Sequence, residues 1–205
     1  SLCYKKHNMS KKDLSVLNLK KSNLNNKTFL IYSNFKSYLE KCVKKKNCLV
    51  AVSGGPDSLA LAVLSKIYSE EKKNRVFFVL IDHGIRPNSS KEAKDVKTLF
   101  KKKKINLTIL KNRKKIDNNI QSQARDVRYK LLLDFCNKNK IKFILTGHHR
   151  EDQIETFLIR LSRGSGIQGL SSMKKISSLN TKTKLIRPLL DEKKQYLAVL
   201  AKQYF

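Results

Sequence analysis

The stretch Cys48-Leu49-Val50-Ala51-Val52-Ser53-Gly54-Gly55-Pro56-Asp57-Ser58 decides the fold of this chain. Its first five residues form a continuous apolar run, which is typical of a strand buried on both faces. Two glycines and a proline interrupt the run, and a helical pattern of apolar residues begins near Ser58. A buried strand, a glycine-rich turn and a helix in direct succession predict the first unit of an α/β fold.

The same alternation repeats along the chain. We expect helices over 35–46, 58–70, 89–103, 120–138, 151–162 and 193–203, strands over 48–52, 76–81, 105–110 and 141–146, and a short edge segment over 186–190. Strands that alternate with helices predict a doubly wound, Rossmann-like parallel sheet with helices on both faces.

The 205 residues predict one domain with a small appendage, at roughly 100–200 residues per domain. Residues 1–28 are polar and lack periodicity, so we expect a poorly ordered basic arm there. Residues 29–190 carry the alternating pattern and form the predicted α/β domain. Residues 191–205 are predicted to form a C-terminal helix.

The composition limits the class of protein. Lys and Arg number 45 against 16 Asp and Glu, a net charge of +29, which favours anionic partners. A/T-rich codon usage, which favours lysine and asparagine, is the alternative origin of this excess. No stretch approaches the roughly 18 apolar residues of a membrane span, and the N-terminus lacks the apolar core of a signal peptide. Four cysteines without a C-x-x-C pair speak against a disulfide scaffold and favour an intracellular compartment.

The loop after the first strand is a candidate phosphate site. Two glycines permit a tight turn, and the N–H groups and positive dipole end of the next helix attract phosphate. The residues of this predicted cradle are Ser53, Gly54, Gly55, Pro56, Asp57 and Ser58. A Walker loop is excluded because its lysine is missing. The alternative is an ordinary turn in which Asp57 or Ser58 caps the helix.

Three further polar segments accompany this loop. Asp82-His83-Gly84-Ile85-Arg86 and Gly147-His148-His149-Arg150-Glu151-Asp152 each follow a predicted strand, and Arg125 and Arg128 share one side of a helix. The carboxyl ends of parallel strands form the ligand edge of open α/β sheets, so these groups are expected near one site. Taken singly, each has a structural alternative: a turn, a solvated helix face, or acids that complement a helix dipole.

Together these segments resemble a known family. S-G-G-x-D-S is the pyrophosphate loop of the ATP-pyrophosphatase (PP-loop) superfamily, whose fold is the adenine nucleotide alpha hydrolase-like class. The set S-G-G-P-D-S, D-H-G-I-R, A-R-x-x-R-Y and H-H-x-E-D-Q-x-E-T-F-L-x-R-L-x-R-G-S-G-I-x-G-L resembles, in order and spacing, the catalytic domain of bacterial and plastid tRNA(Ile)-lysidine synthetases. The resemblance covers about residues 48–190.

The resemblance implies an enzyme that attaches free L-lysine to carbon 2 of the wobble cytidine of an isoleucine tRNA with a CAU anticodon. The family adenylates the C2 oxygen with ATP, releases pyrophosphate, and lets the lysine ε-amine displace AMP. ATP as co-substrate and Mg²⁺ are therefore expected, in the cytoplasm or the plastid stroma. The oligomeric state, a homodimer included, is left open.

Roles follow for the phosphate-binding side of the site. Residues 53–58 would hold the ATP phosphates, and Asp57 would ligate Mg²⁺, which prefers carboxylates and phosphates. Asp82 and His83 would contact ATP or the α-amino group of lysine. Arg86, Arg125, Arg128 and His148 are the candidates for substrate and tRNA contacts.

Roles also follow for the acid–base side. Deprotonating the ε-amine at pH 7 costs roughly 4–5 kcal/mol, so a general base is needed, and Asp152 and Glu155 are the candidates. His149 or His148 would polarise the carbonyl or bind phosphate, and Arg163 would stabilise charge on pyrophosphate or the adenylate.

The sequence departs from the family in two ways. Glu151 stands where the family usually has aspartate. Many members also carry extra carboxyl-terminal domains, so we expect either a minimal form or a fragment, in which 191–205 would begin the next region. The rival functions are a PP-loop tRNA 2-thiolation enzyme, which needs paired cysteines, and an inactive basic RNA-binding protein on the same fold.

Overall fold

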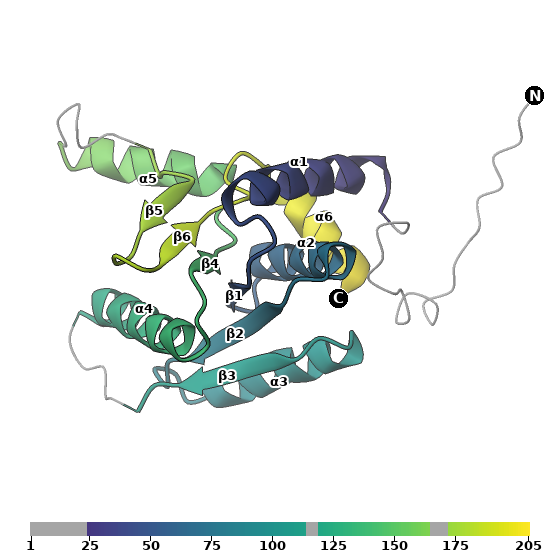
Figure 1. The fold of residues 1–205 in the computed structure, drawn as a ribbon. Helices are drawn as coiled ribbons and strands as arrows, with labels where there is room; N and C mark the ends of the chain where they lie inside the picture. Colours follow the sequence, from purple (N-terminus) through teal and green to yellow (C-terminus); the bar gives the residue numbers. More distant parts are fainter. Residues whose placement is uncertain (1–23, 114–118, 165–171) are drawn as a thin grey trace, which may run out of the picture.

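The computed structural model describes residues 24–113, 119–164 and 172–205, and helices and strands alternate along them (Figure 1). The helices are α1 (Asn26–Cys42), α2 (Pro56–Lys72), α3 (Ser89–Lys102), α4 (Ile120–Lys138), α5 (Arg150–Ser162) and α6 (Lys194–Tyr204). The strands are β1 (Cys48–Val52), β2 (Val76–Asp82), β3 (Leu107–Lys111), β4 (Phe143–Leu145), β5 (Ile176–Ser178) and β6 (Lys184–Ile186).

The described strands form one sheet in the order β3-β2-β1-β4-β6-β5. Strands β3, β2, β1, β4 and β6 pair in parallel, and β5 pairs antiparallel with β6. The chain builds outward from β1 to β3 and then returns to place β4 on the other side of β1. This arrangement confirms the predicted doubly wound α/β fold, with an antiparallel edge strand added to it.

Each face of the sheet has its own core, because successive strand residues point to opposite faces. On one face, Val50 and Phe78 belong to a cluster that also contains residues of α1, α2, α3 and α6. On the other face, Leu49 and Val79 pack with Leu132 of α4. Helices therefore cover both faces, as the alternating pattern predicts.

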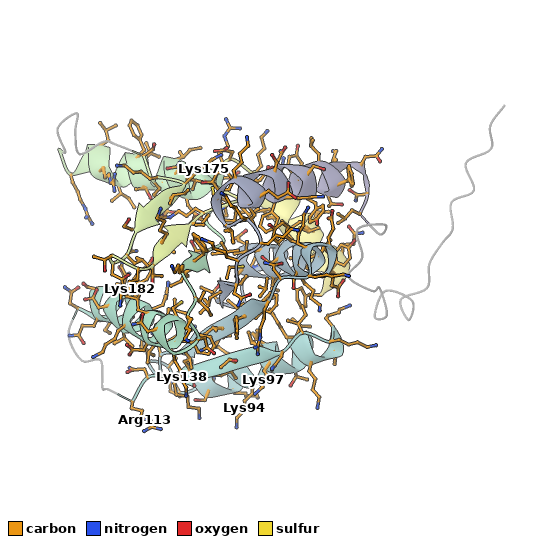
Figure 2. The ribbon with its side chains drawn as sticks, in the orientation of Figure 1. Lys94, Lys97, Arg113, Lys138, Lys175 and Lys182 are labelled. Atoms are coloured by element: carbon orange, nitrogen blue, oxygen red, sulfur yellow. The ribbon has the colours of Figure 1, made fainter. Side chains whose placement is uncertain are left out.

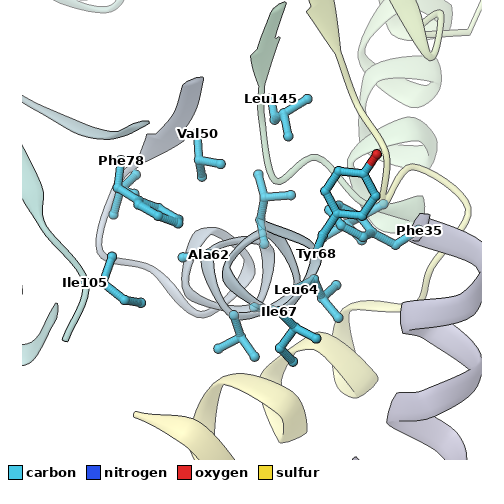
Figure 3. Packing of buried hydrophobic residues seen from close by; sticks show 14 of the residues in the cluster. Phe35, Val50, Ala62, Leu64, Ile67, Tyr68, Phe78, Ile105 and Leu145 are labelled. Carbon is cyan, nitrogen blue, oxygen red and sulfur yellow. The ribbon is translucent and has the colours of Figure 1, made fainter. Parts of the chain in front are cut away.

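Helix α2 lies in the middle of the larger core (Figure 3). Its residues Ala62 and Leu64 are fully buried, and the figure shows Val50, Phe78 and Leu145 of the sheet around the same helix. Burial of a large apolar side chain contributes about 1.5–3 kcal/mol. Because α2 follows the β1 loop directly, this packing also fixes the position of the loop.

The predicted start of the first helix is wrong. Helix α1 begins at Asn26 rather than near Phe35, so residues 26–28 of the expected arm are helical. The Asn25 side chain accepts a hydrogen bond from Thr28 N–H (3.0 Å) and caps the helix. The polar composition of this segment concealed that start signal. Residues 1–23 of the expected arm lie outside the described residues.

The edge of the sheet also differs from the prediction. Strand β6 ends at Ile186, where the expected edge segment over 186–190 begins, and β5 has no predicted counterpart. The three residues Ile-Ser-Ser of β5 are too short and too polar to show an alternating pattern. Backbone pairing with β6, rather than a sequence preference, defines this strand.

No helix in the described ranges combines the length and the apolar character that crossing a membrane requires. Basic side chains project from several elements rather than from one (Figure 2). The figure labels Lys94, Lys97, Arg113, Lys138, Lys175 and Lys182 among them. Such a distribution favours long-range attraction of a polyanion over a single lysine-rich motif.

Candidate active site at the carboxyl edge of the sheet

The loop after β1 turns sharply at Gly54, whose φ of +88° disfavours any residue with a side chain. A Cβ at this position would also come 2.9 Å from Val96 Cγ2 of α3. The Ser58 hydroxyl donates to Gly55 O (2.8 Å) and accepts from Ser53 N–H (3.2 Å). The two serines of the predicted cradle therefore hold the turn in shape and leave its outer surface for a ligand.

The N-terminus of α2 presents N–H groups beside this loop. Gly55 is the N-cap and has no side chain to cap the helix, and Pro56 has no N–H. The first backbone bond of the helix runs from Leu59 N–H to Gly55 O (3.0 Å), so the N–H groups of Asp57 and Ser58 have no partner within the helix. These donors and the positive end of the helix dipole suit a phosphate.

The loop after β4 packs directly on this helix end. A Cβ at Gly147 would come 2.9 Å from Asp57 O and 3.1 Å from Ser58 N, which are backbone atoms that cannot move aside cheaply. Only glycine permits so close an approach. Strands β1 and β4 are the neighbours between which the strand order changes direction, the position where open α/β sheets bind ligands.

His149 connects the two loops. Its Nε2 lies 3.4 Å from Asp57 Oδ2, and its Nδ1 accepts from Asp152 N–H (3.4 Å). Asp152 Oδ2 in turn accepts from His149 N–H (2.8 Å), which completes a reciprocal cap at the start of α5. Asp57 Oδ1 is buried and has no hydrogen-bond partner within the described residues. The structure thus brings three of the predicted catalytic residues together.

Glu151 joins α5 to α6, a role that the sequence did not indicate. Its Oε2 accepts from Lys194 N–H (2.9 Å) and lies 3.2 Å from His149 Nδ1. Lys193, the N-cap of α6, makes no side-chain cap, so this carboxylate occupies the positive end of that helix instead. Here the longer side chain of glutamate links α5 to α6.

Glu155 and Arg163 do not join this cluster. Glu155 is exposed on α5. Arg163 is the exposed C-cap of the same helix, about 16 Å from Asp152 at 1.5 Å per residue. The glycine-rich end of the quoted family motif, R-G-S-G-I-x-G-L, begins at Arg163, and after Gly164 it lies outside the described residues.

A cavity of about 480 Å³ opens between the loops after β1, β2 and β4 and helix α4. This volume is within the range of small-molecule sites. Nine predicted site residues line the cavity: Ser53, Asp57, Ser58, Asp82, His83, Arg86, Arg125, Arg128 and His148. His149 and Asp152 are not part of this lining, and they reach it through Asp57.

Asp82 and His83 both line the cavity, but they differ in how many of their polar atoms already have hydrogen-bond partners. Asp82 Oδ1 accepts from Gly84 N–H (3.1 Å) and Oδ2 from the Ser90 hydroxyl (2.6 Å) at the start of α3. Burial raises the pKa of Asp82, but these hydrogen bonds outweigh burial and lower the pKa overall. His83 Nδ1 is buried without a partner in the described residues, and burial followed by the charge of Arg128 lowers the pKa of His83. Asp82 therefore shapes the loop, and His83 is the residue with a group left for a ligand.

Three of the four predicted arginines line the same cavity, from two sides. Arg125 and Arg128 are exposed on α4, and the guanidinium of Arg125 lies 5.2 Å from the centre of the Tyr129 ring. Arg86 comes from the β2 loop and pairs with Glu92 at the surface (3.3 Å). Exposed guanidinium groups around a cavity suit phosphate contacts.

Arg187 is a residue of this edge that the sequence reasoning missed. It follows β6, the parallel neighbour of β4, and its side chain lies close enough to His148 to affect it electrostatically. Burial lowers the pKa of His148, and the charge of Arg187 lowers it further. His148 Nδ1 also lies 2.9 Å from the Thr146 hydroxyl. A strand assigned to 184–186 would have placed Arg187 at the ligand edge, but the expected edge segment began at Ile186.

A glycine-rich loop between a parallel strand and a helix N-terminus, at the point where the strand order changes direction, defines a nucleotide-binding α/β domain. Residues 27–204 match the family of PP-loop domains. The chain belongs to the PP-loop family.

Relatives with curated names show which members of this family the chain resembles. Over 156 residues the chain is 44% identical to a tRNA(Ile)-lysidine synthase of Wolbachia pipientis wMel, an alignment that covers 75% of this chain and 36% of the relative. It is 43% identical over 149 residues to the protein of the same name from Orientia tsutsugamushi (strain Boryong), covering 72% and 33%. The predicted resemblance is confirmed. The chain spans about a third of the length of these relatives.

Solved structures agree on the fold. The U34-tRNA thiolase NcsA from Methanococcus maripaludis superposes with a TM-score of 0.66 at 19% identity and covers 85% of this chain and 64% of that one. An NH3-dependent NAD synthetase from Campylobacter jejuni gives a TM-score of 0.51 at 16% identity, covering 85% and 70%. At such identities the likeness shows the shared α/β fold.

Proposed function

We propose that this chain is the catalytic domain of a tRNA(Ile)-lysidine synthase, which uses ATP to attach L-lysine to carbon 2 of the wobble cytidine of an isoleucine tRNA with a CAU anticodon. One observation carries the proposal: the phosphate-binding end of α2 meets the acidic cap of α5 at Asp57 and His149. The 44% identity to a tRNA(Ile)-lysidine synthase of Wolbachia pipientis wMel supports the same proposal.

ATP would lie in the cavity with its β- and γ-phosphates on the loop of residues 53–58. The N–H groups of Asp57 and Ser58 would donate to the phosphates, and Arg128 and His83, whose Nδ1 has no partner among the described residues, line the same cavity. This arrangement stabilises the negative charge that develops on pyrophosphate as it leaves. The α-phosphate then faces the cavity, where the C2 oxygen of cytidine attacks it.

The carboxylate of Asp57 is suited to bind Mg²⁺. Its Oδ1 is buried with no partner among the described residues, while Oδ2 faces His149. Protein sites bind Mg²⁺ through one or two carboxylates together with substrate phosphates, and this loop offers both. When bound, the ion neutralises phosphate charge. His149 holds the Asp57 carboxylate in place for it.

Asp152 is the better placed of the two candidate bases for the lysine amine. The cap with His149 fixes its carboxylate near Asp57, and its charge acts on His148 at the cavity wall. Glu155 lies on the next turn of α5, exposed to solvent. Both carboxylates are in contact with solvent in the structure. Either one would take a proton from the lysine ammonium group only once the substrates exclude water from the site.

The two buried cysteines of the described residues argue against the thiolation alternative. Cys48 and Cys136 belong to the cores on opposite faces of the sheet, and burial raises the pKa of each thiol to about 12. Such thiols are inert and cannot meet at one cluster. Within the described residues no group of three His, Cys, Asp or Glu side chains is arranged to hold a metal ion.

The test is to incubate the protein with ATP, Mg²⁺, radiolabelled lysine and a transcript of the CAU-anticodon tRNA. Label incorporation is expected, and Asp57→Asn should reduce it about 100-fold or more, because it removes a charge that acts on the phosphates. Asp134→Asn, which changes an exposed aspartate of α4 outside the cavity lining, is the matched control and should keep full activity.

A second tRNA separates the alternatives. Replacing the wobble cytidine by uridine should abolish incorporation, and pyrophosphate release should stop with it. In a parallel reaction that contains sulfide in place of lysine, incorporation of sulfur into the tRNA would establish the thiolation hypothesis. Binding of the tRNA without consumption of ATP by the wild type would establish the inactive RNA-binding protein.

A further inference from the structure

Arg187 has an unusual environment for a cation. Its side chain is only 8% exposed. Both of its hydrogen bonds use Nη1, which donates to Lys174 O (2.7 Å) and to the Ser177 hydroxyl (3.0 Å). Nε is buried without an acceptor, and no carboxylate of the described residues pairs with the guanidinium. No residue in the described ranges accepts a hydrogen bond from the edge formed by Nε and Nη2.

A buried guanidinium without a counterion is costly, because arginine keeps its charge at any physiological pH. The surroundings do not offset this cost. Burial lowers the pKa of Arg187, Tyr129 opposes this effect, and the charge of Arg125 lowers the pKa further. Arg125 and Arg128 also act together with Arg187 on His148. The acid that acts on His148 from the same surroundings is Asp152. This corner of the site thus carries an excess of positive charge that an anion would balance.

We propose that the Nε–Nη2 edge of Arg187 binds the α-carboxylate of the amino-acid co-substrate, an inference that rests on the proposed function. Arg187 follows β6 at the carboxyl edge of the sheet, beside the β4 loop that carries His148 and His149. The hairpin of β5 and β6 holds Nη1, so the guanidinium is oriented before the ligand arrives.

The carboxylate is a better match than a phosphate for two reasons. The phosphates of ATP have their own donors at the start of α2, on the other side of β4. A phosphodiester of RNA is carried on a bulky chain and suits exposed arginines such as Arg125 and Arg128, whereas Arg187 is buried. A planar two-donor edge pairs with a small carboxylate in a bidentate way.

This anchor orients the rest of the lysine molecule. With its carboxylate on Arg187, the ε-amine lies at the far end of a four-carbon stem, away from the cluster of arginines. Asp152 is the acid that the electrostatics place in these surroundings. Arg187 would then select amino acids over simple diamines, since a ligand without the carboxylate leaves the buried charge uncompensated.

The test compares L-lysine with cadaverine, which is lysine without its carboxylate. Binding of each to the full chain is measured by calorimetry in the presence of a non-hydrolysable ATP analogue, for the wild type and for Arg187→Met. The wild type should prefer lysine by about 10- to 100-fold, the range of a charge-assisted hydrogen bond. In Arg187→Met the preference should disappear, because removing the carboxylate from the ligand and removing the guanidinium from the protein abolish the same interaction.

Two control variants exclude a merely structural effect. Ser177→Ala removes one hydrogen bond of Arg187 to the hairpin and leaves the charge, so the preference for lysine should remain. Arg75→Met removes one exposed arginine whose guanidinium lies over the Phe77 ring at the opposite edge of the sheet, and it should also leave the preference unchanged. Thermal unfolding of all variants checks that they fold.

The inference fails if the wild type binds neither compound or binds both equally. It also fails if Arg187→Met keeps the wild-type preference for lysine. If tRNA binding, measured in the same way, is the only property that weakens in Arg187→Met, Arg187 contacts an RNA phosphate instead. The proposed function fails separately, if lysine binds with the expected preference but is never joined to the tRNA.

Discussion

Helices α2 and α5 both begin at the candidate site, and different kinds of contact hold them in place. Helix α2 follows β1 and has nine buried residues among its seventeen, and Figure 3 shows buried side chains of the core around it. Helix α5 follows β4 and has no buried residue among its thirteen. It exposes Ile154, Phe157, Leu158, Ile159 and Leu161.

Helix α5 is held by polar contacts rather than by buried apolar side chains. His149 and Asp152 cap its start, Glu151 contacts α6, and Gln153 exchanges hydrogen bonds with the backbone of Met173 (2.7 and 3.2 Å). The half of the site with the candidate phosphate loop is thus fixed by apolar packing, and the half with the candidate base is fixed by a few hydrogen bonds. Chemistry that must adapt to a large substrate belongs on the less stable element.

The largest expected effect tests this difference in stability. Leu64→Ala in α2 should lower the free energy of unfolding by about 2–5 kcal/mol, because it leaves a cavity in a fully buried position. Leu158→Ala in α5, where the side chain is 54% exposed, should change it by less than about 0.5 kcal/mol. Urea unfolding curves measure both. A loss above about 2 kcal/mol for Leu158→Ala would show that α5 is packed in solution, and the comparison would fail.

The next effect concerns the contact between the two halves. Gly147→Ala would place a Cβ 2.9 Å from Asp57 O, so the loop after β4 must move away from α2. We expect a loss of about 1–3 kcal/mol in unfolding free energy and a clear loss of lysine incorporation. Gly55→Ala is the control for stability, since its Cβ would meet only Ser53 Oγ at 3.7 Å. Equal stability of both variants would contradict the close approach.

The sequence predicted the sheet because its signals are local. The apolar run 48–52 and the glycines after it define a buried strand and a turn without reference to the rest of the chain. Helix α4 was predicted with its observed ends, Ile120 and Lys138, for the same reason. Strand β5 and the start of α1 were missed, since one depends on pairing with β6 and the other on a single capping residue, Asn25.

The site was predictable where it lies on the loops after buried strands. Asp57, His149 and Asp152 were named from the sequence and meet in the structure. Arg163 was named with them, but a straight helix carries it away from Asp152. Arg187 was not named, because its burial without a carboxylate partner among the described residues is a feature that no sequence pattern reveals.

A smaller effect separates the two roles of Asp152. Asp152→Ala removes the acceptor for His149 N–H, so it should cost about 1 kcal/mol of stability as well as activity. Asp152→Asn keeps an oxygen acceptor and should retain stability while lysine incorporation falls, because an amide cannot take a proton from the amine. Glu155→Gln is the comparison on the same helix. If Glu155→Gln loses activity and Asp152→Asn does not, the base is Glu155.

The smallest expected effect is the dependence of stability on pH. Burial and the charges of Arg187, Arg125 and Arg128 lower the pKa of His148 below its usual value near 6.5, although Asp152 opposes them. The unfolded chain therefore binds more protons just below pH 6.5 than the folded protein does, so this contribution to stability is present above about pH 6.5 and is lost as the pH falls.

Urea unfolding between about pH 7.5 and about pH 5.5 should show this loss, in a range where the carboxylates stay ionised. His148→Gln can keep the contact with the Thr146 hydroxyl and removes the titrating group, so its stability should depend less on pH. The slope that remains in this variant is expected to come from His83, whose pKa burial also lowers. An unchanged slope in His148→Gln would mean that the β4 loop admits water freely, and the half of the site that follows β4 would then be open before any substrate binds.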